Sequence, residues 1–582
     1  MSNDRVIPTP APPDVVTFTV LVDGEQILDT FNVLSINVVK EINKIPYAKI
    51  VLKDGDPSLE DFEVSNTEVF IPGNEIEVLA GYRSEESTIF KGIIIKHGIK
   101  VKKSKASVLV VECRDESVKL TVGRKNKYYY EIKDSEVIEE ILSNYDLEKK
   151  VETTEVKHKE LVQYYSTDWD FILSRADVNG KLVFVDDGKI LINKPDLKQE
   201  SVLSLIYGAT ILEFEAEMDA RTQFSSVKSK TWDYANQEII ESDSEDPAIT
   251  EQGNLSSDDL SDVIGLDALE IQHAGEISNQ ELQSWANAGM LRSRLAKIQG
   301  RVSFQGCADV KPGNIIKLNG VGERFNGNVF VSAIRQEISG GNWATNVQFG
   351  LSPEWFSKRN DIIDTQASGL LPAVSGLQTG KVTQLQDDPD GEDRILVKVP
   401  VIDNQEEGIW ARVATLDAGE NRGTFFRPEI DDEVIIGYLN DDPRNPVILG
   451  MLNSSAKPAP ITASDDNHEK GYVSREKLKL IFNDELKSIK VETPNGNSIT
   501  LNEDDGTIVI VDENDNKIEM SSDGINIESN GDINIKANGD VNIEGTNVSQ
   551  KANAQFKAEG SAGAELSTSA TAVIKGSVVQ IN

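Results

Sequence analysis

The sequence predicts a mainly β protein of several domains with a few helices, and three observations support this. Short runs of alternating apolar and polar residues, broken by Asp-Gly, Asn-Gly and Pro-Gly pairs, recur along most of the chain. At 582 residues and 63.9 kDa the chain is too long for one hydrophobic core. Near its end, "NGDINIKA" at 530–537 is followed by "NGDVNIEG" at 538–545, an eight-residue repeat.

The N-terminal part begins with a proline-rich segment, residues 1–14. Residues 15–120 alternate apolar and polar side chains in runs such as "VVTFTVLVDG" and "NEIEVLAGY", and we expect a first β module there. Residues 121–200 form an α/β segment. "KDSEVIEEILSNYDL" has apolar residues at helical spacing behind Asp134-Ser135, which predicts a helix.

A second helix is predicted in "STDWDFILSRADVNG", capped by Ser166 or Thr167 and followed by a hairpin turned at Asp187-Gly188. Residues 201–363 return to strands and form a second β module. It contains an acidic, serine-rich insertion at 241–262, whose composition favours a mobile loop. "QELQSWANAGMLRSRLAKIQ" predicts a further helix.

The C-terminal third is expected to be entirely β. A linker at 364–380 precedes a compact β segment at 381–453, and a second linker at 454–470 leads into the tail, 471–582. That tail repeats short alternating strands and turns of Gly, Asn and Asp, as in "SIKVETPNG" and "NSITLNEDDG".

The octads pose a packing problem, because a strand of about four residues buries only alternate side chains and has too little area to fold alone. Stacking within one chain would give a solenoid, and stacking with two other copies would give an intertwined triangular prism. Late repeats such as "QKANAQFKAEGSAGAELSTS" supply little apolar area, so we favour a homotrimer that shares one core. The predicted core positions are Ile525, Ile527, Ile533, Ile535, Val541 and Ile543.

Four other interpretations of the tail are weaker. A disordered acidic tail or an exposed β segment does not explain the regular isoleucines. A calcium-binding β-roll needs paired glycines at nonapeptide spacing, which the tail lacks. A β-helical, polysaccharide-active enzyme could stack Asp532 and Asp540 on one face, but their place in Asn-Gly-Asp sequences favours a role in turns.

Composition limits the classes of function. The formal net charge of −38 and the pI near 4.5 disfavour nucleic-acid binding, because phosphate would repel the chain. Two distant cysteines, Cys113 and Cys307, do not predict a disulfide and are expected to be buried free thiols. The N-terminus lacks the features of a secretory signal, and no apolar run is long enough for a transmembrane helix. We expect synthesis in the cytoplasm.

We predict no catalytic, cofactor-binding or metal-binding residues. The four histidines have no metal-ligand spacing, and "DENDNK" at 512–517 lacks the glycine and glutamate of a calcium loop. No nucleotide-binding loop or nucleophile elbow is present in the sequence.

Four stretches resemble the VgrG-type trimeric spike and hub proteins of contractile injection systems, which are related to the hub and tail-spike proteins of contractile phages. They occur in the family's order, at 164–185, 294–320, 409–452 and 493–525. The third is the most specific and includes "DPRNPVILG". The matching motif residues are Trp169, Phe171, Arg422, Gly423, Phe426, Pro428, Glu429, Asp432, Glu433, Pro446 and Gly450.

The resemblance implies a hub made of two barrel-like β modules, which three copies would assemble into a pseudo-hexameric ring. It also implies a small barrel at 381–453 of the oligonucleotide/oligosaccharide-binding (OB) type and a trimeric β-helical spike at 471–582. Such a protein adapts a six-fold tube to a three-fold needle. Of the known arrangements, we favour an extracellular contractile particle over a type VI secretion system.

The partners implied are an inner tube protein, baseplate proteins, a PAAR-type tip protein, effector cargo and the target cell membrane on firing. No nucleic-acid partner is expected. The last histidine is His468, so no apex metal is predicted, and neither the 454–470 gap nor the chain end provides room for an enzyme domain. The expected contacts with the tip protein are Val578, Val579, Ile581 and Asn582.

Overall fold

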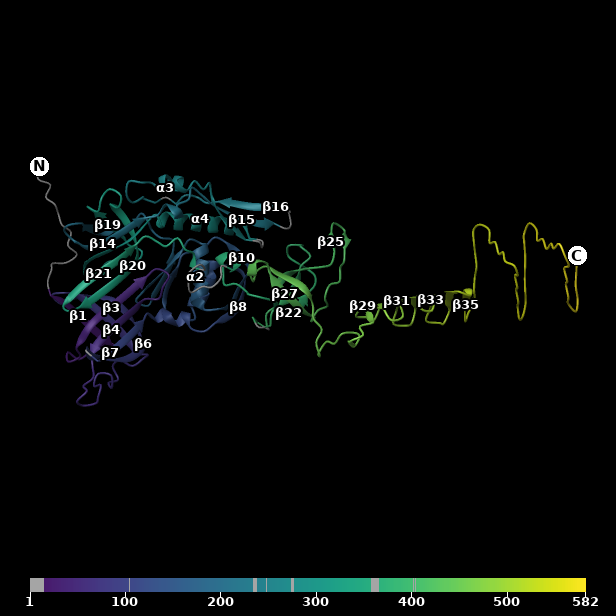
Figure 1. Ribbon diagram of the computed structural model, residues 1–582, viewed down its shortest axis with the longest axis horizontal. Helices are drawn as coiled ribbons and strands as arrows, with labels where there is room; N and C mark the ends of the chain where they lie inside the picture. Colours follow the sequence, from purple (N-terminus) through teal and green to yellow (C-terminus); the bar gives the residue numbers. More distant parts are fainter. Residues whose placement is uncertain are drawn as a thin grey trace. The chain divides into compact units, whose positions relative to one another are not determined.

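The computed structural model confirms a mainly β chain and divides it into two units, residues 1–453 and 454–582 (Figure 1). It describes residues 15–103, 105–233, 238–247, 249–273, 277–356, 366–400, 402–403 and 405–581. The predicted proline-rich segment 1–14 lies outside these residues. The two units are described separately.

One large sheet of 13 strands organises the first unit, and its main path can be followed in Figure 1. In spatial order the strands are β14 (Ile211–Met218), β18 (Ile298–Gln305), β21 (Asn342–Phe349), β20 (Gly327–Ser339), β3 (Val33–Glu41), β4 (Tyr47–Lys53), β7 (Lys105–Arg114), β6 (Glu85–Lys102), β5 (Glu75–Tyr82), β1 (Val16–Val22) and β2 (Glu25–Gln26). Off this path, β19 (Ile315–Asn319) pairs with β20 and, in parallel, with β13 (Ser201–Ile206).

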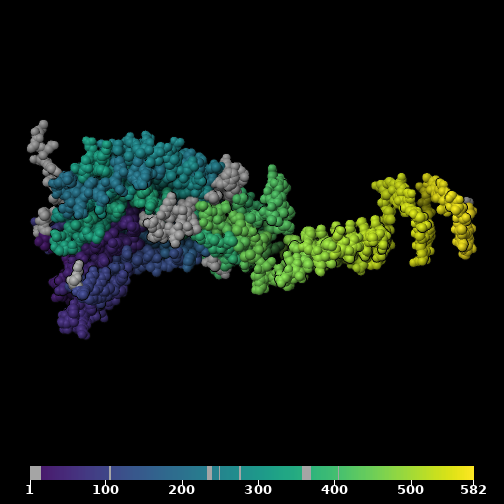
Figure 2. Space-filling model, in the orientation of Figure 1, coloured from purple at the N-terminus to yellow at the C-terminus, as the bar shows by residue number. Residues whose placement is uncertain are grey.

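The two predicted β modules are parts of this one continuous sheet. They join where β20 pairs antiparallel with β3, from Ala333 opposite Glu41 to Ser339 opposite Ser35. Each module keeps its own core of aliphatic and aromatic side chains. Figure 2 shows the purple and teal stretches lying against each other. Cys113 and Cys307 are buried free thiols, as predicted.

The predicted helices of the first unit are present. They are α1 (Asp134–Leu142), α2 (Asp168–Val178) and α4 (Asn279–Leu295). Thr167 is the N-cap of α2, and its side chain accepts a hydrogen bond from the Asp170 amide at 3.0 Å. Short 3-10 turns occupy Glu116–Thr121, Ala220–Thr222, Gln366–Gly369 and Leu439–Asp441.

Three small sheets accompany these helices. The first pairs β8 (Lys125–Lys133) with β10 (Lys157–Ser166); the second contains β11 (Leu182–Asp186), β12 (Lys189–Asn193) and β9 (Glu148–Val151); the third contains β16 (Glu238–Asp243), β15 (Val227–Asp233) and β17 (Leu269–His273). The predicted hairpin is formed by β11 and β12, and Asp187 and Gly188 both have positive φ at its turn.

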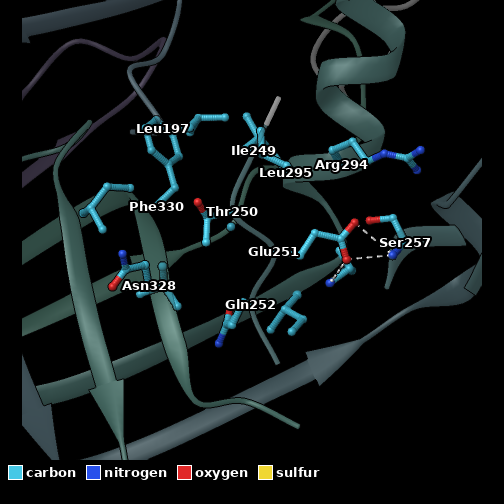
Figure 3. A pocket seen from close by; sticks show the side chains of 15 residues that line it. Leu197, Ile249, Thr250, Glu251, Gln252, Ser257, Arg294, Leu295, Asn328 and Phe330 are labelled. Atoms are coloured by element: carbon cyan, nitrogen blue, oxygen red, sulfur yellow. Dashed lines mark hydrogen bonds and ion pairs between the residues drawn. The ribbon is translucent and has the colours of Figure 1, made fainter. Parts of the chain in front are cut away.

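The acidic insertion at 241–262 is not the simple loop that its composition predicts. It includes the end of β16 and the beginning of α3 (Ser257–Ile264). Figure 3 shows Glu251 turned toward Ser257. The Glu251 carboxylate accepts bonds from the Ser257 amide at 2.8 Å and from Lys297 Nζ at 2.6 Å. Lys297 is nearly buried, so this ion pair attaches the insertion to the second module.

A closed five-stranded barrel ends the first unit. Its order is β22 (Gln378–Gln384), β23 (Ile395–Lys398), β24 (Ile409–Val413), β28 (Pro446–Met451) and β27 (Glu433–Tyr438), with a small hairpin of β25 (Ala418–Gly419) and β26 (Arg422–Gly423). The predicted linker before it is partly core instead, because Leu370, Leu371 and Val374 are buried.

The second unit contains one antiparallel seven-stranded sheet in sequence order. Its strands are β29 (Glu469–Val473), β30 (Lys479–Asn483), β31 (Ser488–Glu492), β32 (Ser498–Asn502), β33 (Thr507–Val511), β34 (Lys517–Ser521) and β35 (Gly524–Glu528). From 529 to 581, the described chain contains no strand or helix. The octads therefore make no strand pairs within one copy, which differs from stacking as an intrachain solenoid.

Candidate functional site: the apolar face of the C-terminal sheet

One face of the seven-stranded sheet is apolar along its length. Antiparallel pairing places apolar residues opposite one another on successive strands, and this creates two columns. The first column is Leu480, Val491, Ile499, Ile510, Ile518 and Ile527. The second column is Phe482, Ile489, Leu501, Ile508, Met520 and Ile525.

These twelve side chains are open to solvent in a single copy, with exposed fractions between 36% and 68%. A hollow of about 590 Å³ runs along part of the first column, lined by Val491, Ile499, Ile510 and Ile518 among others. The alternate positions of the strands are mostly charged or hydroxylated, as Lys490, Thr500 and Glu519 illustrate. The rest of the chain is polar, so a continuous exposed apolar strip marks a surface that a partner covers.

The predicted spike-core residues fall into two groups. Ile525 and Ile527 lie on β35, at the ends of the two columns. Ile533, Ile535, Val541 and Ile543 follow the last strand, with exposed fractions between 53% and 75%. Their placement at a trimer axis stays a prediction. The residues between 480 and 520 were missed as core positions, although the same alternation is visible in their sequence.

A buried cluster of charges lies in the first unit, where the helices meet. The Arg175 side chain on α2 is fully buried; its Nε donates to Asp134 Oδ1 at 2.6 Å and its Nη2 to Glu281 Oε1 at 3.0 Å. These two ion pairs of Arg175 connect α2 to the first residue of α1 and to α4. His158 Nε2 lies 3.0 Å from Asp134 Oδ2, and Asn179 donates to the same oxygen at 2.9 Å.

The barrel joins this cluster through Arg444, which follows β27. Arg444 Nη1 donates to both oxygens of Glu281 at 2.9 Å, and Nη2 donates to Asp442 Oδ2 at 2.8 Å. His273 Nε2 lies 3.1 Å from the same Asp442 oxygen. Burial opposes ionisation of Glu281, but Arg444 and His158 outweigh it and lower the pKa of Glu281 to about 2. Glu281 is thus ionised at neutral pH, and its pairs with Arg175 and Arg444 fix the barrel to the helices.

No local pattern in the sequence indicates this cluster, because its members come from segments far apart in the chain. His158 and His273 were expected to have ordinary core or surface roles, and both are buried among the charges. Apolar packing strengthens the same junction: Tyr128 and Val162 of the β8–β10 sheet join the barrel core. Tyr130 Oη donates to the Gly408 carbonyl at 3.0 Å.

Glu160 faces a cavity of about 240 Å³ between β10 and the barrel. Burial raises the pKa of Glu160 to about 7, against the opposing effect of Arg394. Since the folded protein then binds this proton more tightly than the unfolded chain, stability falls as the pH rises from 4.5 to 7.

We therefore expect Glu160→Gln to stabilise the first unit at pH 8 by up to about 3 kcal/mol, and to change little at pH 5. Thermal unfolding of both proteins at the two pH values measures this. An equal effect at both pH values would show that the raised pKa of Glu160 does not limit stability.

The motif residues lie in two places. Trp169 and Phe171 are buried on α2 in the main helical core. Arg422 Nη1 pairs with Asp417 Oδ1 at 2.8 Å in the small hairpin of the barrel. Gly423 has φ +135°, and a Cβ there would lie 2.4 Å from the Asp417 carbonyl oxygen, so the turn requires glycine.

The other barrel motif residues surround β27 and β28. Phe426 is exposed, Pro428 is buried, and Asp432 Oδ2 accepts a bond from the Glu429 amide at 2.9 Å. Glu433 begins β27, and Pro446 begins β28, which also contains Gly450. They support the barrel's loops and strands.

The predicted tip contacts Val578, Val579 and Ile581 are exposed, and Asn582 lies outside the described residues. Among the residues that the structure describes, no group of three His, Cys, Asp or Glu side chains is arranged to hold a metal ion. In the same residues, no helix has the length and apolar character needed to cross a membrane.

Comparison with known families gives two matches. The family described as "Alg8 N-terminal domain" matches residues 12–340, more than half of the chain. The family described as "Type VI secretion system/phage-baseplate injector OB domain" matches residues 378–452, the closed barrel. The OB-like interpretation of this segment is thereby confirmed.

Two curated relatives are similar over short stretches. The chain is 32% identical over 72 residues to the type VI secretion system spike protein VgrG1a of Pseudomonas aeruginosa, a match covering 12% of this chain and 11% of that protein. It is 36% identical over 62 residues to VgrG3 of Vibrio cholerae, covering 11% and 6%. The chain thus matches only about a tenth or less of these relatives' lengths.

Among solved structures, the Francisella PdpA–VgrG complex in its half-lidded form has a chain of similar fold. It aligns with a TM-score of 0.52 at 9% identity, covering 88% of each chain. The lidless form of a PdpA–VgrG complex also gives 0.52 at 9% identity and covers 89% and 99%. These likenesses concern the fold.

Proposed function

We propose that this chain, which belongs to the family described as "Alg8 N-terminal domain", is the trimeric spike and hub of a phage-tail-like contractile injection system. The observation that carries the proposal is the uncovered apolar face of the seven-stranded sheet. The injector OB match and the spike names of the curated relatives support the same function.

Three copies meet the requirements of this face better than two. Two sheets packed face to face would cover the apolar columns, but they would leave the backbone of the octads without strand partners. In an intertwined three-fold prism, each octad strand lies beside a strand of another copy, and the isoleucines point to the shared axis. Both the side chains and the backbone are then satisfied.

Such a prism would act as a puncturing needle. Its strands are hydrogen-bonded between copies, so no chain can be peeled away without breaking a continuous ladder. The sheet-based modules of the first unit would form the ring that receives an inner tube protein and baseplate proteins. A PAAR-type tip protein would bind Val578, Val579 and Ile581 at the far end, and effector cargo would travel with the particle into the target cell.

We place the protein in an extracellular contractile particle, made in the cytoplasm and released from the cell. The alternative is the spike of a type VI secretion system, which is the system named for both curated relatives. A neighbouring gene for an anchoring membrane complex would favour that alternative. The relatives' spike names support a structural role over a catalytic one.

Amide hydrogen exchange of the full-length protein tests the interchain strands directly. We expect slow exchange for the Ile533–Ile535 and Val541–Ile543 amides, although neither segment pairs within one copy. Exchange at the rate of an unstructured peptide in both octads would overturn the intertwined prism.

A further inference from the structure

The outer part of the ribbon formed by β6 and β7 is basic, in contrast to the rest of the chain. Residues 87–111 contain six lysines and no aspartate or glutamate, whereas the whole chain has 97 acidic and 59 basic residues. The chain's acidic background would normally place about four carboxylates in such a segment. This ribbon is therefore a distinct positive surface on a strongly negative protein.

The outer part of β6 has an unpaired margin. β5 pairs with β6 only as far as Ile93, so from Lys96 to Lys102 the strand pairs with β7 alone. Lys100 and Lys102 are exposed, and in the described part of the chain neither has an ion-pair partner. Lysines on an exposed edge strand commonly prevent it from pairing with the edge strands of other molecules. An acidic strand could still pair with this edge, because its charge is opposite.

The opposite end of the same sheet is acidic. Strand β14 is the last strand of the path, and its Phe214, Ala216 and Met218 pack on the core of the second module. The residues between and beside them, Glu213, Glu215 and Glu217, are exposed on the other face. Glu215 pairs with Arg301 at 2.5 Å, and both side chains of that pair are exposed.

The two surfaces are opposite in charge but are separated within one copy. Lys100 and Lys102 lie two residues apart, with a register shift in the β6–β7 pairing between them. Glu213, Glu215 and Glu217 follow the two-residue period of a strand. Seven strand spacings, about 34 Å along the sheet, lie between β14 and β6. Figure 1 shows the two strands toward opposite margins of the sheet. A head-to-tail contact between copies would bring them together.

We propose that the basic β6–β7 ribbon of one copy docks on the acidic strand β14 of the next copy and closes the three-fold ring. This inference rests on the proposed trimer and specifies which surfaces form its ring contact. When this heterologous contact is repeated three times, the ribbon of each copy binds β14 of the next copy, and no ribbon or β14 strand is left over. Opposite charges would select this register over the many contacts between acidic surfaces, which repel one another.

Zero-length cross-linking of the full-length protein tests the contact. Unlabelled and ¹⁵N-labelled chains are unfolded together, refolded and treated with a carbodiimide, which joins lysine amines to carboxylates in direct contact. We expect mixed-isotope links from Lys100 or Lys102 to Glu213, Glu215 or Glu217. Links from these lysines only to other carboxylates, in a protein that remains a trimer, would overturn the ring contact and leave the proposed spike intact. A monomer would overturn both.

Charge reversal provides a second test that does not depend on cross-linking chemistry. We expect Lys100→Glu/Lys102→Glu, and separately Glu213→Lys/Glu217→Lys, to speed exchange of copies between trimers by about tenfold at low salt. Combining the four changes should restore the original rate, while Lys100→Arg/Lys102→Arg should leave it unchanged. Equal exchange rates in all variants, or a combined variant no slower than either pair, would overturn the proposal.

Discussion

Replacing Ile510 by Asp is expected to convert the full-length protein from a trimer to a monomer. Ile510 lies in the middle of the first apolar column, opposite Ile499 on one side and Ile518 on the other. In a shared prism, three carboxylates would enter one apolar layer with no cation nearby. Each unpaired buried charge costs several kcal/mol, so three of them in one layer strongly oppose assembly.

Light scattering of the purified variant measures the outcome. Thr500→Asp is the matched control, because Thr500 belongs to the neighbouring strand but occupies the opposite, polar face. The control should remain a trimer. An Ile510→Asp protein with the mass and melting temperature of the control would contradict an axial position for this column. Ile533→Asp, measured in parallel, tests in the same way whether the octad isoleucines lie at the trimer axis.

Arg175→Met is expected to destabilise the first unit by about 3–5 kcal/mol. The substitution keeps most of the side-chain volume but leaves the buried carboxylates of Asp134 and Glu281 without their shared cation. It also removes the hydrogen bond from Nη1 to the Leu370 carbonyl, which is 2.7 Å long. Chemical denaturation, followed by a probe of the first unit, measures the free energy of unfolding.

The matched control for this prediction is Arg221→Met, which removes an exposed arginine paired with Asp219 at 2.5 Å. An exposed pair of this kind contributes little to stability, so this control should be close to the original protein. If Arg175→Met lowered the free energy of unfolding by no more than Arg221→Met does, the buried cluster would not be what joins the helices to the barrel.

Local patterns in the sequence predicted local structure well. Asp134-Ser135 and Thr167 start helices, and Asp187-Gly188 turns a hairpin, because each depends on neighbours within a few residues. The barrel at 378–451 was placed to within a few residues, because its motif is continuous in sequence.

Long-range contacts were the part that the sequence did not reveal. Nothing local indicates that β20 pairs with β3, some 300 residues earlier, so the pairing that joins the two modules was not predicted. The acidic insertion reads as a loop because the buried partner of Glu251, Lys297, lies 46 residues away. The charged cluster around Glu281 likewise depends on Arg444, at a separation of 163 residues.

The native mass of the full-length protein, measured by light scattering with negative-stain images of the same sample, tests the central claim most directly. A trimeric spike is expected to have a mass near three times 63.9 kDa and to form particles with a wide head and a thin needle. A monomer without a needle would contradict it, because the apolar face and the octads would then remain without the partners that the proposed spike requires.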